Sequence, residues 1–157
     1  MNSTHFMKQI TSCFALLFAL GVTASYAQSN LKEGNNNFAR YTKSGDIKDL
    51  LEARKFADLA YKEKRDSASY NNTLLRGLVY SSLAVADSSK SQTYVKDPID
   101  EAEFMLSRLN DEQLNYENEA QITYLKKRLA NAYLIRANRA LINNNYEEAY
   151  KLFTKVD

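Results

Sequence analysis

The sequence predicts an all-α protein built from stacked antiparallel helical hairpins, about three in number. Residues with strong helix propensity dominate the chain, whereas glycine occurs four times and proline once. No alternating β-branched run of strand length is present. The clearest hairpin lies at residues 126–157, where apolar residues recur at intervals of three and four on both sides of Asn143-Asn144-Asn145.

Residues 1–27 are interpreted as a secretory signal peptide. They contain one base and no acid, and an apolar core covers residues 14–22. Ser25 and Ala27 place small residues before a cut that would make Gln28 the first mature residue. The core is too short for a bilayer span, which needs about 20 apolar residues. We therefore expect an exported, periplasmic or envelope-associated chain with no stable membrane span after cleavage.

Composition excludes several kinds of chemistry. Cys13 and His5 are the sole cysteine and histidine, and both fall in the expected signal. The mature chain would then lack disulfides, thiolate or imidazole zinc sites, and nucleophile–histidine pairs. Cys13 also precedes the apolar core, whereas a lipidated cysteine follows one. A net charge of +2 argues against a nucleic-acid partner. We expect no cofactor, no metal and no catalysis.

Residues 28–157 are expected to form one helical domain. Helices are predicted at 30–42, at 46–64, from Asp66 or Ser67 to a serine-rich loop at 87–96, at 97–109, in a long stretch ending at 142, and at 146–156. Asp46 and Asn145 are expected to cap helix starts, and Asp97-Pro98 combines a cap with proline at the first helical position. Residues 110–118 either connect to the long helix or begin it.

Small residues recur at matching places along the chain. Ala53, Ala102 and Ala149 are each followed by apolar residues four and seven positions later. Gly77 and Tyr80 likewise match Ala130 and Tyr133. Five small residues are therefore expected at close contacts between helices: Ala53, Gly77, Ala102, Ala130 and Ala149. Tyr80, Tyr133 and Tyr146 are expected in the core.

The last unit resembles a tetratricopeptide repeat. Leu129-Ala130-Asn131-Ala132-Tyr133 is similar to the signature of the first helix, and Asn144-Asn145-Tyr146-Glu147-Glu148-Ala149 with Phe153 to the turn and second helix. The resemblance covers residues 30–157 and is weakest in the first unit. It implies a tetratricopeptide-like α-solenoid that binds other proteins. The signal style resembles that of exported Bacteroidota proteins.

The chain also departs from the tetratricopeptide pattern. Its units exceed 40 residues, against about 34 in the family. The segment between Tyr133 and Ala149 carries about two extra helical turns. An array that stops straight after an apolar helix suggests a longer protein continuing beyond residue 157, or a face covered by a partner.

Tyr124, Lys127 and Asn131 are the candidate residues of a partner-binding groove. By resemblance, Lys127 and Asn131 fall where some repeat proteins hold a partner's C-terminal carboxylate. The matching residues in the second unit, Leu74 and Leu78, cannot donate hydrogen bonds. An ordinary solvated helix face is the alternative for this pair, and core or edge packing is the alternative for Tyr124.

The resulting hypothesis is a non-catalytic scaffold of the cell envelope that binds a protein or peptide. A nutrient- or glycan-binding outer-membrane component with similar helices is one alternative. The other is a helical enzyme that uses carboxylates alone, drawn from the pairs Asp100/Glu103 and Glu147/Glu148.

Overall fold

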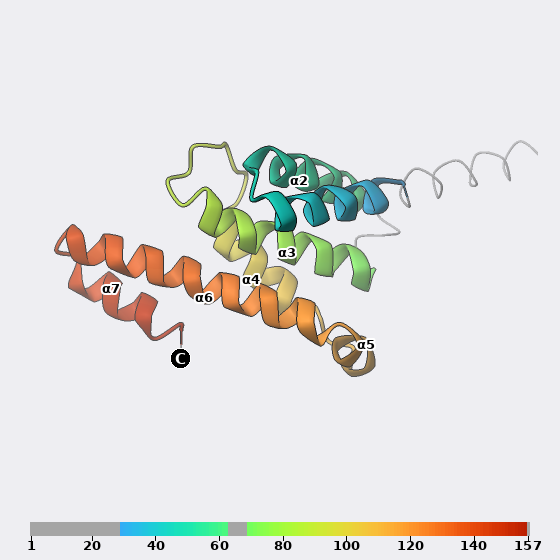
Figure 1. The fold of residues 1–157 in the computed structure, drawn as a ribbon. Coiled ribbons are helices and arrows are strands. Elements are labelled where there is room, and N and C mark those ends of the chain that lie inside the picture. The colour runs from blue at the N-terminus through green and yellow to red at the C-terminus, as the bar shows by residue number, and fades with distance from the viewer. Residues whose placement is uncertain (1–28, 63–68, 157) are drawn as a thin grey trace, which may run out of the picture.

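A computed structural model describes residues 29–62 and 69–156, and within these ranges the chain forms helices and turns without a strand (Figure 1). A helix at residues 29–44 is followed by α2 (Ile47–Lys62), α3 (Tyr70–Ala86), α4 (Pro98–Ser107), α5 (Glu112–Glu117), α6 (Glu119–Ile142) and α7 (Tyr146–Phe153). The all-α prediction is confirmed. The signal peptide and the helix start at Asp66 or Ser67 lie outside the described residues.

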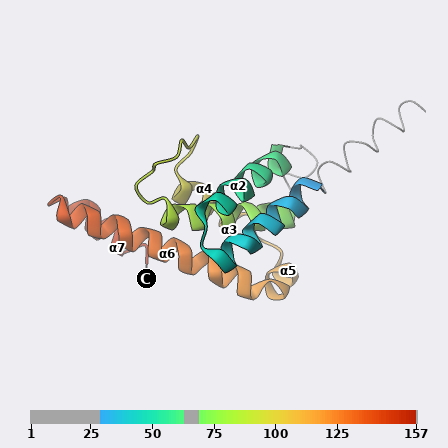
Figure 2. The same ribbon diagram turned by 45° about the horizontal axis from the view of Figure 1, so that its top comes forward.

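Helix α3 lies at the centre of the fold. It packs against α2, α4 and α6, while α7 folds back along α6 (Figures 1 and 2). Most of its residues are buried, including Leu75, Val79 and Leu83. A helix that is buried on nearly all sides needs neighbours all round. In the described ranges, no helix is long and apolar enough to cross a membrane.

Gly77 permits the closest contact among α3, α4 and α6. A Cβ atom at this position would lie 2.6 Å from Leu125 Cδ1 of α6 and 3.3 Å from Met105 Cβ of α4. Glycine in a helix interior costs about 1 kcal/mol relative to alanine. The expected compensation, a close approach of neighbouring helices, is confirmed here.

The expected alanine contacts are also present, with one exception. Ala53, Ala102 and Ala149 are essentially inaccessible to solvent. Ala130 is instead half-buried, because α7 packs farther along α6 and leaves this part of the helix open on one side. The position matched to Gly77 therefore faces a groove and not a neighbouring helix.

Three predicted helix starts are confirmed by their hydrogen bonds. The Lys48 amide donates to Asp46 Oδ1 at 2.9 Å, and the Ile99 amide donates to Asp97 Oδ1 at 2.9 Å. At the α6–α7 turn, the Glu148 amide donates to Asn145 Oδ1 at 3.3 Å. Asn144 takes the left-handed conformation at φ 57° that closes helix C-termini.

Two details differ from the sequence-based expectation. Residues 110–118 contain a separate helix, α5, and are neither a plain connection nor the start of the long helix. Asp111 caps α5 by accepting a hydrogen bond from the Leu114 amide at 3.0 Å. The core position predicted for Tyr146 is wrong, since its side chain is 66% exposed. Tyr146 begins α7 at the tip of the hairpin, beyond the packed part of the molecule.

The loop before α4 is organised by the buried carboxylate of Asp87. The Ser91 amide and hydroxyl donate to Asp87 Oδ1 at 2.8 and 2.6 Å, and the Gln92 amide and Tyr94 hydroxyl donate to Oδ2 at 3.0 and 2.6 Å. Burial alone would raise the pKa of Asp87, but these hydrogen bonds outweigh it and lower the pKa to about 2. Ionised Asp87 therefore stabilises the loop.

Asp87→Asn is predicted to remove part of the acid sensitivity of folding. The folded-state pKa of Asp87 is lowered. Its contribution to the free energy of unfolding is therefore complete above the unfolded-state pKa of about 4 and is lost as pH falls towards 2. The variant should lose up to about 2 kcal/mol at neutral pH and less in acid. Urea unfolding from pH 7 to pH 2 measures this, with exposed Asp100→Asn as the control. Parallel curves for wild type and Asp87→Asn would contradict the assignment.

Ala149→Arg is predicted to destabilise the hairpin by about 3 kcal/mol or more, because it places an unpaired charge where α6 and α7 touch. Tyr150→Arg changes the neighbouring, 72% exposed position and serves as the control. Thermal and urea unfolding measure both. Equal stability of the two variants would contradict the described packing of α7.

Candidate functional site

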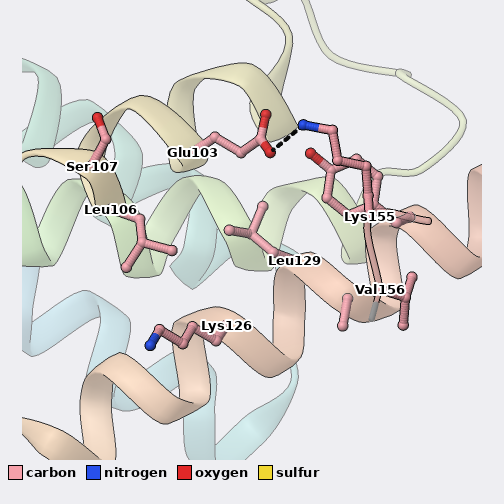
Figure 3. Close-up of a pocket in the computed structure, with 9 residues that line it drawn as sticks. Glu103, Leu106, Ser107, Lys126, Leu129, Lys155 and Val156 are labelled. Atoms are coloured by element: carbon pink, nitrogen blue, oxygen red, sulfur yellow. Dashed lines mark hydrogen bonds and ion pairs between the residues drawn. The ribbon is translucent and has the colours of Figure 1, made fainter. Parts of the chain in front are cut away.

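A groove opens where α7 stops covering α6. Helix α6 has 24 residues, whereas α7 has eight, so α7 covers only part of it. Lys155 and Val156, in the turn that follows α7, border a cavity of about 430 Å³ together with α4 and α6 (Figure 3). This volume falls in the range of small-ligand and side-chain pockets.

The inner surface of the groove is mainly apolar. Leu106 of α4, Leu129 of α6 and Val156 of the C-terminal turn line it (Figure 3). Ala130 of α6 also contributes to this surface. Leu129 is buried, and the other three are half-buried. The groove thus presents partly exposed apolar surface between two helices.

One side of the groove is closed by a neutralised charge pair. Lys155 Nζ lies 3.3 Å from Glu103 Oε1 and 6.0 Å from the centre of the Tyr133 ring. Burial raises the pKa of the Tyr133 hydroxyl, and the nearby Glu103 carboxylate raises it further. Tyr133 therefore stays protonated, and Glu103 is already matched by a cation and a hydroxyl.

Lys126 lies across the groove from this pair (Figure 3). It is exposed. Within the described ranges its ammonium group forms no ion pair or hydrogen bond, unlike that of Lys155. The groove consequently carries one cation that remains available to an anionic group.

The two helical walls are fixed to each other by Asp97. Arg136 of α6 pairs with this carboxylate, and Lys90 Nζ lies 2.7 Å from Asp97 Oδ2. Burial acts to raise the pKa of Asp97, but hydrogen bonds from Lys90 and Arg136 outweigh it and lower the pKa. The same residue caps α4, so one carboxylate sets both the start of α4 and its position beside α6.

Of the three predicted partner-binding residues, Tyr124 is half-buried and packs against the core. Its ring meets Phe38 edge-on at 6.2 Å between centroids, and its hydroxyl lies 3.4 Å from the Ser82 hydroxyl. Nearby, Arg128 donates to the Tyr41 hydroxyl at 3.1 Å. The helix at residues 29–44 therefore contacts α6 directly at Tyr124.

Lys127 and Asn131 are exposed on α6, outside the groove. In the described part of the chain neither side chain has a hydrogen bond or ion pair to hold it in a clamp geometry. A carboxylate clamp at this pair stays a prediction. Their immediate neighbours on α6, Lys126 and Ala130, line the groove together with Leu129 and Tyr133 of the same helix.

The sequence predicts a partner-binding groove on α6 but places it at residues other than those that line the cavity, although one signal for its position is present. The extra helical turns between Tyr133 and Ala149 move α7 away from the first half of α6. Which side of α6 is left open depends on the angle at which α4 and α7 cross it, and helical spacing alone does not give that angle.

A second polar cluster joins α2, α3 and α4. Arg76 pairs with Asp58 and donates to Glu101 Oε1 at 2.9 Å, and its guanidinium lies 4.7 Å from the ring centres of both Tyr61 and Tyr80. Burial opposes the charge of Arg76, but Glu101 and Asp58 raise its pKa. The charged side chains at the centre of this cluster are paired with opposite charges. The cluster therefore stabilises the packing of α2, α3 and α4.

Two of the four carboxylates considered for acid–base chemistry form ion pairs with lysines. Glu103 pairs with Lys155, and Glu147 pairs with Lys151 at 2.8 Å on the exposed side of α7. Among the described residues, no group of three or more histidines, cysteines and acids is arranged to hold a metal ion.

Comparison of the chain with protein-family models, with curated proteins and with solved structures finds no match in any of the three.

Proposed function

We propose that this chain is a non-catalytic, tetratricopeptide-like scaffold that binds a protein or peptide partner at the cell envelope. The observation that carries the proposal is the groove between α4, α6 and the turn after α7. Its partly exposed surface of Leu106, Ala130 and Val156 has the chemistry of a site that buries an apolar side chain of another chain.

The order of the helices supports a divergent solenoid. The helix at residues 29–44 precedes α2, α3 packs on α4, and α6 packs on α7, while α3 also contacts α2 and α6. This is the succession expected from hairpins stacked in chain order. The buried Ala53, Ala102 and Ala149 stand at matching places in the three second helices.

Export is proposed from the sequence of residues 1–27 alone. The uncharged apolar core and the small residues before Gln28 match the pattern of a cleaved signal. The mature protein would then work in the periplasm or on the envelope. An intact mass that retains residues 1–27 in protein recovered from the envelope would contradict this proposal.

Ala130→Phe is predicted to abolish partner binding, because the added ring fills the groove from its α6 wall. Thr123→Phe adds the same ring at an exposed position of α6 outside the groove and is the matched control. The measurement is a crosslinking pull-down from envelope extracts with the full chain and both variants. The wild type and Thr123→Phe should capture a partner that Ala130→Phe does not. Equal capture by all three, or no capture, would contradict the proposal.

A further inference from the structure

The groove continues the course of α7 along α6. Helix α7 packs on α6 and ends at Phe153, and Lys155 and Val156 of the turn that follows form part of the groove wall. A rod placed end to end with α7 would therefore rest on the uncovered part of α6. A helix is a suitable occupant, since helices pack side by side at axial distances of about 8–10 Å.

The charges of the groove favour an acidic occupant. Glu103 is neutralised by Lys155 and lies beside the protonated Tyr133 hydroxyl, so it does not need a cation from a partner. Lys126, on the other side, is the groove charge that forms no ion pair within the described ranges. A carboxylate placed beside Lys126 would complete the pairing, whereas a second ammonium group would be repelled.

Resting on the function proposed above, we infer that the groove binds a short acidic helix of a partner protein. A bulky apolar side chain of that helix enters between Leu106, Leu129 and Val156. An aspartate or glutamate one helical turn away pairs with Lys126, because side chains three or four positions apart share a helix face.

The two contacts have different roles. Burial of the apolar side chain provides most of the affinity, since it removes surface from water on both partners. Lys126 is exposed, so its ion pair adds a modest term to affinity and mainly selects acidic over basic segments. Reversal of its charge should therefore change the preferred sequence more than the overall capacity to bind.

The test is selection of a displayed random dodecapeptide library on the full chain, followed by affinity measurements on the enriched peptides. Enriched peptides should carry a large apolar residue with an aspartate or glutamate three or four positions away. Lys126→Glu should weaken their binding about tenfold, and selection on that variant should enrich basic residues instead. Lys48→Glu, an equal charge change at an exposed residue of α2 outside the groove, should leave binding unchanged. Proline between the two key positions should abolish binding, because it breaks the helix.

The outcomes separate this inference from the proposed function. Three results would overturn the acidic-helix inference and leave the proposed function standing, provided that Ala130→Phe abolishes peptide binding. The enriched peptides would lack acidic residues, would still bind with the proline inserted, or would bind Lys126→Glu as well as the wild type. Peptides that bind Ala130→Phe as well as the wild type, or a library without any enriched peptide, would overturn both.

Discussion

The arrangement of this molecule depends on the close approach of three helices at Gly77. A Cβ atom at this position would lie 2.6 Å from Leu125 Cδ1 of α6 and 3.3 Å from Met105 Cβ of α4, so a larger residue would require both neighbours to shift. That contact fixes α6 against α3 and brings α4 beside both. Around it, Arg76 ties α2 and α4 to α3 through Asp58 and Glu101, so α3 and α4 are held both by packing and by charge pairing.

The groove follows from this arrangement and from helix length. Once α6 is seated on α3, its 24 residues extend beyond what the eight residues of α7 can cover. Asp97 keeps the α4 wall at its place beside α6 through Arg136. The open surface therefore lies between helices on two sides. A site of this kind loses little conformational entropy when a partner binds.

Local chemistry made most of the fold predictable, whereas the site depended on geometry that a sequence does not show. Asp46, Asp97 and Asn145 begin helices because their side chains accept backbone hydrogen bonds, and such signals lie within a few residues. The buried alanines follow from helical spacing. The tetratricopeptide resemblance points to Lys127, whereas Lys126 lines the groove, because a difference of one residue turns a side chain by about 100° around a helix. Helical spacing predicts Tyr146 in the core, but the side chain is exposed. Spacing along one helix does not reveal where a hairpin extends past its neighbours.

The central claim is that the turn after α7 lies beside α4 and closes one side of the groove. Zero-length carbodiimide coupling of the unmodified chain, followed by peptide mass spectrometry, tests it directly, since this reagent joins amines to carboxylates that are already in contact. Lys155 and Glu103, 3.3 Å apart but distant in sequence, should be joined as readily as the neighbouring pair Lys151 and Glu147 within α7. Recovery of the Lys151–Glu147 product without any Lys155–Glu103 product would contradict the account.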